Sequence, residues 1–362
     1  MRKIAASRGA DRKRAGIRRA LPAWYRKHAR DLPWRRESDP YRIWLSEILL
    51  QQTRIDTVLP YYSRFVELFP TLRALADGSE DQVLKAWEGL GYYGRARNLH
   101  KAAKIIMSDH GGCLPETLEG WRSLPGIGRY TAGAITSIAF GRPVAAVDGN
   151  VKRVLARLFS ITDSIDEPAG SEKIWSLAGS LVPRKDPGLF NQALMDLGAR
   201  ICVPKEPLCG ECPLERYCEA HASGQQAMLP KRRPKKKVPH YEIVAAAIRK
   251  NGRYLLGKRP SSGLLGGLWE FPGGKVEPGE THEEALVREL REEMDITVRV
   301  CERIASVKHA YTHFSITLHA FRCEHMDGRP QTNFHSEVKW VLRGDLKRYA
   351  FPAADLKFMD RL

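Results

Sequence analysis

The stretch that decides the fold is Leu124-Pro125-Gly126-Ile127-Gly128-Arg129-Tyr130-Thr131, followed by Val147-Asp148-Gly149-Asn150. Its two glycines permit a tight turn between two helices, and we expect the second helix to begin near Arg129. Backbone N–H groups at a helix start are unpaired, so they can bind a phosphate without reading base sequence. The pattern predicts a helix-hairpin-helix turn that holds a nucleic-acid backbone at Gly126 and Gly128. The alternative is an ordinary turn inside a helical core.

The charge of the chain agrees with a polyanionic ligand. It has 59 Lys and Arg against 42 Asp and Glu, a formal net charge of +17. Residues 1–36 contain 13 Lys and Arg against only Asp11 and Asp31, and residues 231–237 contain one uncharged residue. Basic runs are often only solvated surface. Because the glycine turn indicates the same ligand, polyanion binding is the economical interpretation.

The chain changes character around residues 224–240, a polar and basic stretch typical of a linker. Apolar residues recur at helical spacing before it, whereas strands joined across Asn251-Gly252 and one helix near residues 281–294 are expected after it. We expect four parts: a basic N-terminal arm over residues 1–20, a helical domain over 21–224, a basic linker over 225–239 and an α/β domain over 240–362.

No apolar run in the sequence reaches membrane-spanning length. The arginine-rich start has the composition of an organelle transit peptide but lacks a secretory apolar segment, so a disordered arm is the preferred interpretation. We expect an intracellular protein without a membrane partner, cytoplasmic and at the nucleoid if bacterial.

Four of the seven cysteines lie close together as Cys202-x6-Cys209-x2-Cys212-x5-Cys218. A reducing compartment does not favour disulfides, so this spacing indicates a metal site. Zinc bound by four cysteines is common, but zinc ribbons usually pair two Cys-x2-Cys knuckles and only one is present. The spacing is similar to the 4Fe-4S loop of helix-hairpin-helix DNA glycosylases, which favours a cluster over zinc.

A second acid, Glu47, is predicted on a helix that starts at Asp39-Pro40. Trp44 and Leu50 flank it at helical spacing, so its carboxyl group is a candidate for poor solvation. Desolvation would raise its pKa and keep it protonated, as a general acid requires. A single Glu on an amphipathic helix is more often exposed, and spacing alone leaves both interpretations open.

With these residues in view, the chain resembles the MutY-type adenine DNA glycosylases over nearly its whole length. Besides the glycine turn and the cysteine loop, the resemblance is carried by residues 31–35, 44–53, 89–93, 147–150 and 191–199. It implies an all-α helix-hairpin-helix glycosylase domain with a 4Fe-4S cluster loop at residues 202–218, followed by an α/β Nudix-like domain.

The same resemblance implies hydrolysis of the N-glycosidic bond of adenine mispaired with 8-oxoguanine or guanine in duplex DNA. The adenine must first leave the base stack. By analogy, Glu47 protonates the leaving base at N7 and Asp148 stabilises the positively charged sugar. Two carboxyl groups in different protonation states are the physical requirement.

Further positions of the family carry over residue by residue. Tyr130 and Asn150 match positions that orient the sugar and the water, and Gln52 and Tyr92 match residues that wedge into the stack. The endonuclease III branch has a lysine at the position of Tyr130 and cleaves the strand through a Schiff base. Because tyrosine cannot form that imine, we expect base removal that leaves an abasic site.

The segment Gly274-x5-Glu280-x7-Arg288-Glu289-Leu290-Arg291-Glu292-Glu293-Met294-Asp295-Ile296 resembles a Nudix box, except that the family has glycine where Asp295 stands. In Nudix hydrolases the glutamates matching Glu289, Glu292 and Glu293 bind Mg²⁺ against a diphosphate. Two interpretations stay open: nucleotide hydrolysis, or a charged helix retained for stability and DNA recognition, which we favour.

The family uses a Phe-Ser-His loop against 8-oxoguanine, and the matching residues are Tyr311-Thr312-His313. Thr312 keeps the hydroxyl but adds a methyl group, and Tyr311 keeps an aromatic face. The resemblance therefore implies that Thr312 and His313 contact the lesion. The expected partner is duplex DNA with an adenine:8-oxoguanine or adenine:guanine mispair, bound by a monomer, with the linker as the place for a repair-protein partner.

Overall fold

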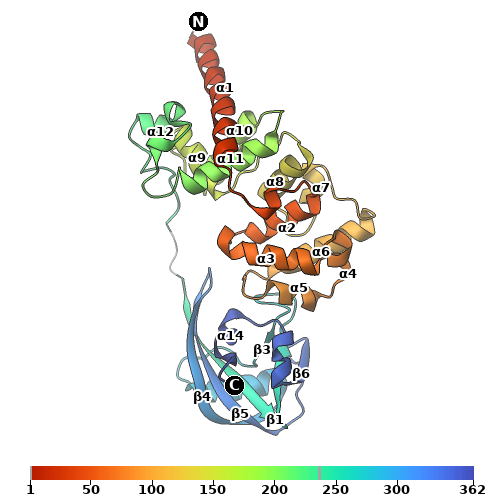
Figure 1. The fold of residues 1–362 in the computed structure, drawn as a ribbon. Coiled ribbons are helices and arrows are strands. Elements are labelled where there is room, and N and C mark those ends of the chain that lie inside the picture. The colour runs from red at the N-terminus through yellow and green to blue at the C-terminus, as the bar shows by residue number, and fades with distance from the viewer. Residues whose placement is uncertain (1, 235–237) are drawn as a thin grey trace. The chain divides into compact units, whose positions relative to one another are not determined.

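The computed structural model describes residues 2–234 and 238–362 (Figure 1). Met1 and residues 235–237, which are part of the predicted basic linker, lie outside the described residues. The predicted fold class, a helical half followed by an α/β half, is confirmed. The chain forms two compact units, Met1–Gln52 with Ile105–Lys235 and Thr53–Lys104 with Lys236–Leu362, so a helical segment clusters with the sheet.

The first unit is helical. Its elements are α1 (Arg2–His28), a 3₁₀ turn η1 (Pro33–Arg35), α2 (Pro40–Leu50), α7 (Leu118–Arg122), α8 (Arg129–Phe140), α9 (Gly149–Leu158), α10 (Pro168–Leu181), α11 (Pro187–Arg200), the 3₁₀ turns η2 (Cys209–Glu211) and η3 (Glu215–Tyr217), and α12 (Glu219–Ala222). Its core packs α9 and α11 together through aliphatic side chains such as Val151, Leu155, Leu194 and Leu197.

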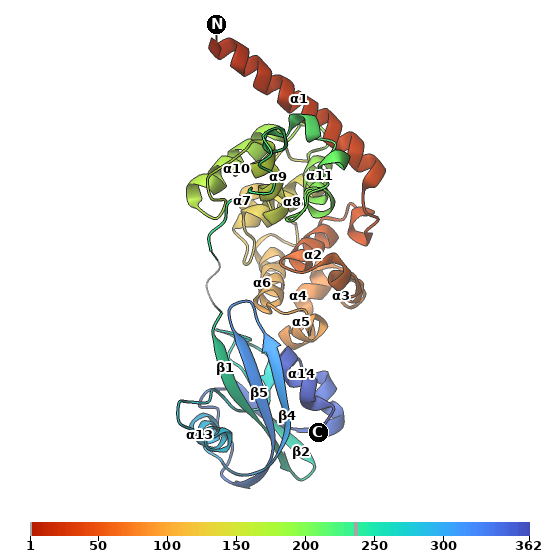
Figure 2. The same cartoon turned by 90° about the vertical axis from the view of Figure 1, so that its left-hand side faces the viewer.

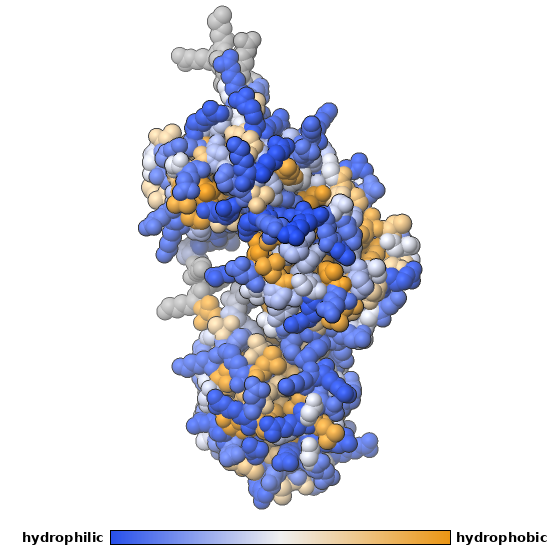
Figure 3. All heavy atoms as spheres, in the orientation of Figure 1, coloured by the Kyte–Doolittle hydropathy of each residue, from blue (hydrophilic) through white to orange (hydrophobic). Residues whose placement is uncertain are grey.

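Residues 1–20 were expected to form a disordered arm, but from Arg2 onward they belong to helix α1. Ile17, Leu21 and Tyr25 recur every fourth residue and are buried in the core of the first unit. This spacing places them on one apolar stripe of the helix. The many Lys and Arg residues of the segment led to the prediction of a disordered arm, because composition alone does not show such a stripe. The charged residues Asp11, Arg12, Arg18 and Arg19 of the same helix are exposed, and blue, hydrophilic atoms are prominent on the coloured part of α1 in Figure 3.

The predicted glycine turn lies between α7 and α8. Gly126 has a φ of +75°, a conformation that glycine adopts without steric cost. Gly128 caps the N-terminus of α8 and provides no side-chain acceptor for the first backbone N–H groups of that helix. Leu124 and Ile127 are buried and hold the turn against the core. Helix α8 begins at Arg129, as predicted, and Tyr130 lies in its first turn.

The second unit contains four helical elements before its sheet: α3 (Ile55–Leu68), α4 (Leu72–Asp77), α5 (Glu80–Trp87) and α6 (Gly94–Asp109), whose last residues belong to the first unit. The later elements are β1 (His240–Lys250), β2 (Arg253–Lys258), β3 (Trp269–Glu270), α13 (His282–Met294), β4 (Thr297–Ala310), β5 (Ser315–Asp327), β6 (Glu337–Leu342), the 3₁₀ turn η4 (Arg343–Arg348) and α14 (Ala353–Met359).

The strands form one mixed sheet of order β3-β2-β1-β5-β4, with β6 paired to β2. Strands β1 and β5 are parallel, and the other pairs are antiparallel. Asn251 and Gly252 both have positive φ, as the predicted two-residue hairpin between β1 and β2 requires.

Each face of this sheet is covered by a helix, α13 on one side and α14 on the other (Figure 2). Because side chains alternate along a strand, Val244 and Ala246 of β1 pack under α13, whereas Ala245 and Ala247 pack under α14. No described helix combines the length and the apolar character that a membrane crossing requires.

Candidate active site

Helix α2 places Glu47 in the interior of the first unit. Asp39 caps the helix by accepting a hydrogen bond from the backbone N–H of Tyr41 at 2.9 Å, and Pro40 occupies the first helical position. Glu47 is 6 % exposed, and its Oε2 accepts a hydrogen bond of 2.9 Å from the hydroxyl of Tyr130 in the first turn of α8. The glycine turn thus delivers an aromatic hydroxyl to a buried acid.

The environment of Glu47 holds its proton near neutral pH. Burial raises the pKa of this carboxyl group from 4.5 to about 7. The hydrogen bond from Tyr130 and the charge of Arg35 lower the pKa, and the negative charge of Asp148 raises it. Burial dominates, so both the acid and its conjugate base are accessible at neutral pH, which is the property of a general acid-base group.

Asp148 is the N-cap residue of α9. Its Oδ1 accepts a hydrogen bond of 2.6 Å from the backbone N–H of Val151, and its Oδ2 accepts one of 3.1 Å from the side-chain amide of Asn150. Burial raises the pKa of Asp148 above its usual value, and the two hydrogen bonds and the charge of Arg153 reduce this rise without cancelling it. Since the charge of Asp148 acts on Glu47 and on Tyr130, the structure brings the four predicted catalytic residues together.

Arg153 fixes the orientation of Asn150. It donates hydrogen bonds of 2.8 Å to Asn150 Oδ1 and 2.7 Å to the carbonyl oxygen of Gly198. With its oxygen engaged, the Asn150 amide presents its NH₂ group to Asp148. A Cβ atom on Gly198 would lie 2.7 Å from Cβ of Asn150, so glycine permits α11 to approach α9 here. Sequence reasoning did not identify Arg153, and no local signal marks it.

Behind Glu47 lies a buried ion-pair group that sequence reasoning also missed. Asp196 on α11 is fully buried and accepts two hydrogen bonds from Arg35, of 2.8 and 2.9 Å, and further bonds from Arg30. Burial raises the pKa of Asp196, but these arginines outweigh it and hold the pKa below its usual range. The group positions the positive charge of Arg35 that acts on Glu47. Residues 31–35 and 191–199 carried the family resemblance, which is the signal that could have identified it.

The predicted DNA-binding residues belong to both units. Gln52 of the first unit is exposed directly after α2 with a φ of +59°. In the second unit Tyr92 is 38 % exposed, has a φ of +49° and makes a hydroxyl–hydroxyl hydrogen bond with Thr312. His313 lines the cavity of the α/β half. Tyr92, which is predicted to wedge into the base stack, and Thr312, which is predicted to contact the lesion, are therefore in contact although they lie 220 residues apart in sequence.

The four cysteines Cys202, Cys209, Cys212 and Cys218 line one small hollow together with Arg157. Arg157 is 2 % exposed and donates hydrogen bonds of 2.7 and 2.9 Å to the carbonyl oxygens of Val203 and Pro204. It also lies 3.4 Å from the sulfur of Cys202. A buried guanidinium that fixes the loop and faces sulfur suits a site for anionic thiolates.

The box-like segment runs from the loop before α13 through that helix, and Glu280 in this loop pairs with Arg288 on the helix. Its glutamates Glu289, Glu292 and Glu293 line a cavity of about 710 Å³. Burial and the neighbouring Glu270 raise the pKa of Glu293 to about 8. Its Oε2 has no hydrogen-bond partner among the described residues.

The departure at Asp295 has a structural explanation. Asp295 caps the C-terminus of α13 with φ +53° and ψ +42°, the left-handed conformation for which glycine is the usual residue. Asp is one of the few other residues that adopts this conformation routinely. The backbone after the box therefore keeps the shape that glycine would give it.

Comparison with known proteins agrees with this architecture. Residues 45–179 match the HhH-GPD superfamily of base excision DNA repair proteins, and residues 243–361 match the NUDIX domain. The chain is 35 % identical to the adenine DNA glycosylase of Homo sapiens over 93 % of its own length and 72 % of that protein. It is 37 % identical to the adenine DNA glycosylase of Buchnera aphidicola subsp. Acyrthosiphon pisum over 80 % of its length and 81 % of that protein.

Among solved structures, a thermostable thymine-DNA glycosylase is similar to 59 % of this chain and 99 % of its own, with a TM-score of 0.55 and 31 % identity. The similarity to that structure thus covers a smaller share of this chain than the similarity to the human relative does. The chain belongs to the adenine DNA glycosylase family.

Proposed function

We propose that this protein removes adenine mispaired with 8-oxoguanine or guanine from duplex DNA by hydrolysis of the N-glycosidic bond, leaving an abasic site. The observation that carries the proposal is the buried carboxyl group of Glu47, with a pKa of about 7, hydrogen-bonded to Tyr130 and within the electrostatic reach of Asp148. Release of adenine from duplexes that contain it opposite 8-oxoguanine tests the proposal. Alkali-dependent nicking of the adenine strand is the expected product.

The two acids have different tasks in this reaction. Glu47 donates its proton to N7 of the leaving adenine and afterwards assists the attacking water. Asp148 receives two N–H donors that favour its carboxylate, and this negative charge stabilises the positive sugar of the transition state. Asn150, held by Arg153, orients the water and the sugar.

Tyr130 makes the enzyme monofunctional. Its burial and the adjacent carboxyl groups raise the pKa of the phenol well above its usual value, so it stays a neutral hydrogen-bond donor. It offers no amine to attack the sugar. Borohydride should therefore trap no protein–DNA adduct with the wild type, whereas the Tyr130→Lys variant is the positive control. Abundant trapping with the wild type would overturn this assignment.

Lesion recognition is assigned to the loop that holds Thr312 and His313, with Tyr92 beside it. The hydrogen bond between Tyr92 and Thr312 supports a joint action of the wedge and the loop on one strand. Thr312→Ala should reduce the preference for adenine opposite 8-oxoguanine over adenine opposite guanine, and Thr332→Ala is the matched control. Unchanged discrimination in Thr312→Ala would remove the loop from the proposal. Gln52, Gly126 and Gly128 are proposed to contact DNA from the first unit.

For the cysteine loop we propose a 4Fe-4S cluster, held by Cys202, Cys209, Cys212 and Cys218. The four cysteines line one hollow with Arg157, and their spacing includes only one Cys-x2-Cys knuckle. This spacing supports an iron-sulfur cluster over a zinc ribbon, which usually pairs two such knuckles. When bound, the cluster organises the loop. About four iron and four sulfide per chain are expected on analysis, and one zinc without iron would contradict the cluster.

Nucleotide hydrolysis by the α/β half is a second candidate function. The observation that favours it is the cavity of about 710 Å³ that brings Glu289, Glu292 and Glu293 together with aromatic side chains. Such carboxylates could hold Mg²⁺ against a diphosphate. Release of pyrophosphate from 8-oxo-dGTP by the full chain, abolished in Glu292→Gln, would establish it. Absence of turnover would leave α13 as a helix for stability and recognition.

Three further expectations rest on the sequence alone. The monomeric state and the intracellular location stay predictions. A repair-protein partner at residues 225–239 also stays a prediction, and that segment lies partly outside the described residues.

A further inference from the structure

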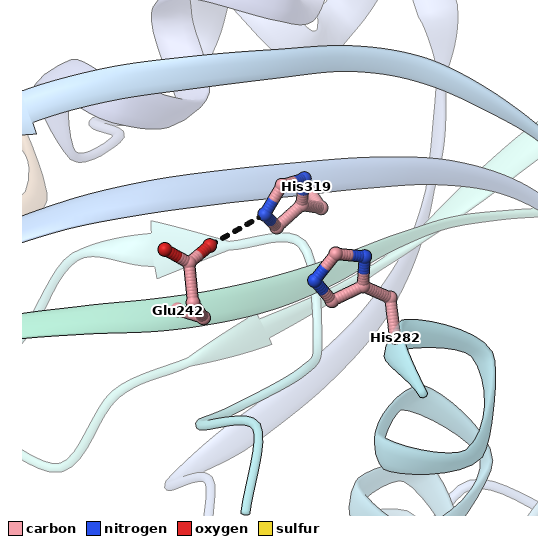
Figure 4. Close-up of side chains that lie close together, drawn as sticks. All are labelled: Glu242, His282 and His319. Carbon is pink, nitrogen blue, oxygen red and sulfur yellow. Dashed lines mark hydrogen bonds and ion pairs between the residues drawn. The ribbon is translucent and has the colours of Figure 1, made fainter. Parts of the chain in front are cut away.

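A cluster of histidines and one glutamate lies on the α13 face of the sheet, away from the box cavity. Its members are Glu242 on β1, His319 on β5 and His282 at the start of α13. Their ligand atoms all lie within 4.8 Å of one another (Figure 4). None of the three lines the cavity that contains the box glutamates, so the cluster is a separate feature of the domain.

The alternation of side chains along β1 and β5 explains why polar side chains lie on the face of the sheet that α13 covers. On β1 and β5 the residues that face α13 are apolar at Val244, Ala246 and Phe321, and they form the core beneath that helix. Two residues nearer the start of each strand, and therefore on the same face of the sheet, lie Glu242 on β1 and His319 on β5. His319 is only 7 % exposed, so its imidazole has left water and needs polar partners.

Both ring nitrogens of His319 have such partners. Nδ1 lies 2.9 Å from the hydroxyl of Ser306 on β4, and Nε2 lies 2.7 Å from Oε2 of Glu242. A hydroxyl on one nitrogen fixes the ring and directs the other nitrogen, as the outer partners of metal-binding histidines do.

His282 completes the group from a different element. Its ring stacks on that of His319 with the centroids 3.9 Å apart and an interplanar angle of 23°. Figure 4 shows the ring reaching from the start of α13 toward Glu242 and His319. In addition, His240 Nε2 lies 3.1 Å from the second carboxylate oxygen of Glu242. Imidazole and carboxylate donors from β1, β5 and α13 thus converge on one point.

We propose that Glu242, His282 and His319 bind one divalent transition-metal ion of the zinc type, with His240 or water as the fourth ligand. Two imidazole nitrogens and one carboxylate oxygen suit Zn²⁺, whereas Mg²⁺ prefers oxygen ligands alone, so this site and the box differ in metal chemistry. A bound ion would tie the N-terminus of α13 to the sheet. This helix carries the box glutamates, so the ion would be a structural support for that segment.

The site is tested on the full chain with its cysteine loop loaded, by titration with Zn²⁺ and, separately, with Co²⁺. The wild type should bind one equivalent of Zn²⁺, and Co²⁺ should give the absorption of a nitrogen and oxygen site without thiolate charge-transfer bands. Because each variant removes a ligand, Glu242→Gln and His282→Ala should weaken binding by more than about 10-fold. His325→Ala, on the same strand but bonded to Gly328, should bind as the wild type does.

A thermal readout separates metal binding from misfolding. Zn²⁺ should raise the Tm of the wild type and of His325→Ala, but not that of Glu242→Gln, which keeps the size of the side chain. If His282→Ala fails to fold, Glu242→Gln alone decides. Equal Zn²⁺ affinity in the wild type and in Glu242→Gln, or no binding by the wild type, would overturn the proposal.

Discussion

The pH dependence of adenine release follows directly from the environment of Glu47. With a pKa of about 7, the carboxyl group is half protonated at neutral pH. Only the protonated form can donate to the leaving base, so kcat/KM should fall about tenfold for each pH unit above about pH 8. An ordinary glutamate, with its pKa near about 4.3, would already have lost almost all of that proton at neutral pH.

The Tyr130→Phe variant tests the cause of this behaviour. The hydrogen bond from Tyr130 lowers the pKa of Glu47, so its removal should raise that pKa and move the alkaline limb to higher pH. Loss of one hydrogen bond to a charged group, worth about 1.5–3 kcal/mol, corresponds to a shift of about 1–2 pH units. Tyr254→Phe, a buried tyrosine of the α/β half, is the control and should leave the limb in place.

The assay measures base release across the pH range with the DNA substrate at concentrations well below KM. Under this condition the rate gives kcat/KM, whose pH dependence reports the pKa values of groups in the free enzyme. DNA affinity measured over the same range excludes a loss of binding as the cause. A limb that stays in place in Tyr130→Phe, or moves to lower pH, would refute the reasoning that this hydroxyl stabilises the Glu47 carboxylate.

Three other substitutions give distinct outcomes. The raised pKa of Glu47 means that its protonated carboxyl group contributes fully to stability below about pH 4.5, and that this contribution is lost as the pH rises through about 7. Glu47→Gln should therefore be more stable than the wild type by about 3 kcal/mol at about pH 8. At about pH 4 the two should have the same free energy of unfolding, as measured with urea. Gly198→Ala would crowd the neighbouring asparagine on α9 and should slow base release while DNA binding is retained, whereas Gly179→Ala, with open space around it, should keep the wild-type rate. Asp196→Asn leaves two arginines without a buried counter-charge and should lower the free energy of unfolding by about 3–5 kcal/mol, while Asp31→Asn at an exposed ion pair should leave Tm unchanged.

Local chemistry made part of the site predictable. The glycine turn, the cap of α2 at Asp39 and the helix start after Asp148 each depend on residues within a few positions of one another. Such signals can be read from a sequence because a turn or a cap is satisfied by its own neighbours. Family resemblance then selected Glu47 over the other glutamates on helices.

The missed features depend on distant segments. The ion pair between Arg35 and Asp196 joins residues 161 positions apart, and neither residue carries a local mark of that contact. The helical structure of residues 2–20 in α1 was not predicted, because the apolar residues of its buried stripe, such as Ile17 and Leu21, lie in a strongly basic segment. Burial in a tertiary core, which stabilises a helix more than propensity does, is not visible in composition.

The central claim is that the carboxyl groups of Glu47 and Asp148 perform the excision of adenine. The most direct measurement is single-turnover adenine release from a duplex with adenine opposite 8-oxoguanine, for the wild type, Glu47→Gln and Asp148→Asn. Because general acid catalysis contributes about 100-fold or more, Glu47→Gln should lose at least that factor in rate, and Asp148→Asn should also be impaired, with Kd for the duplex unchanged in both. Wild-type rates of adenine release in either variant would contradict the account.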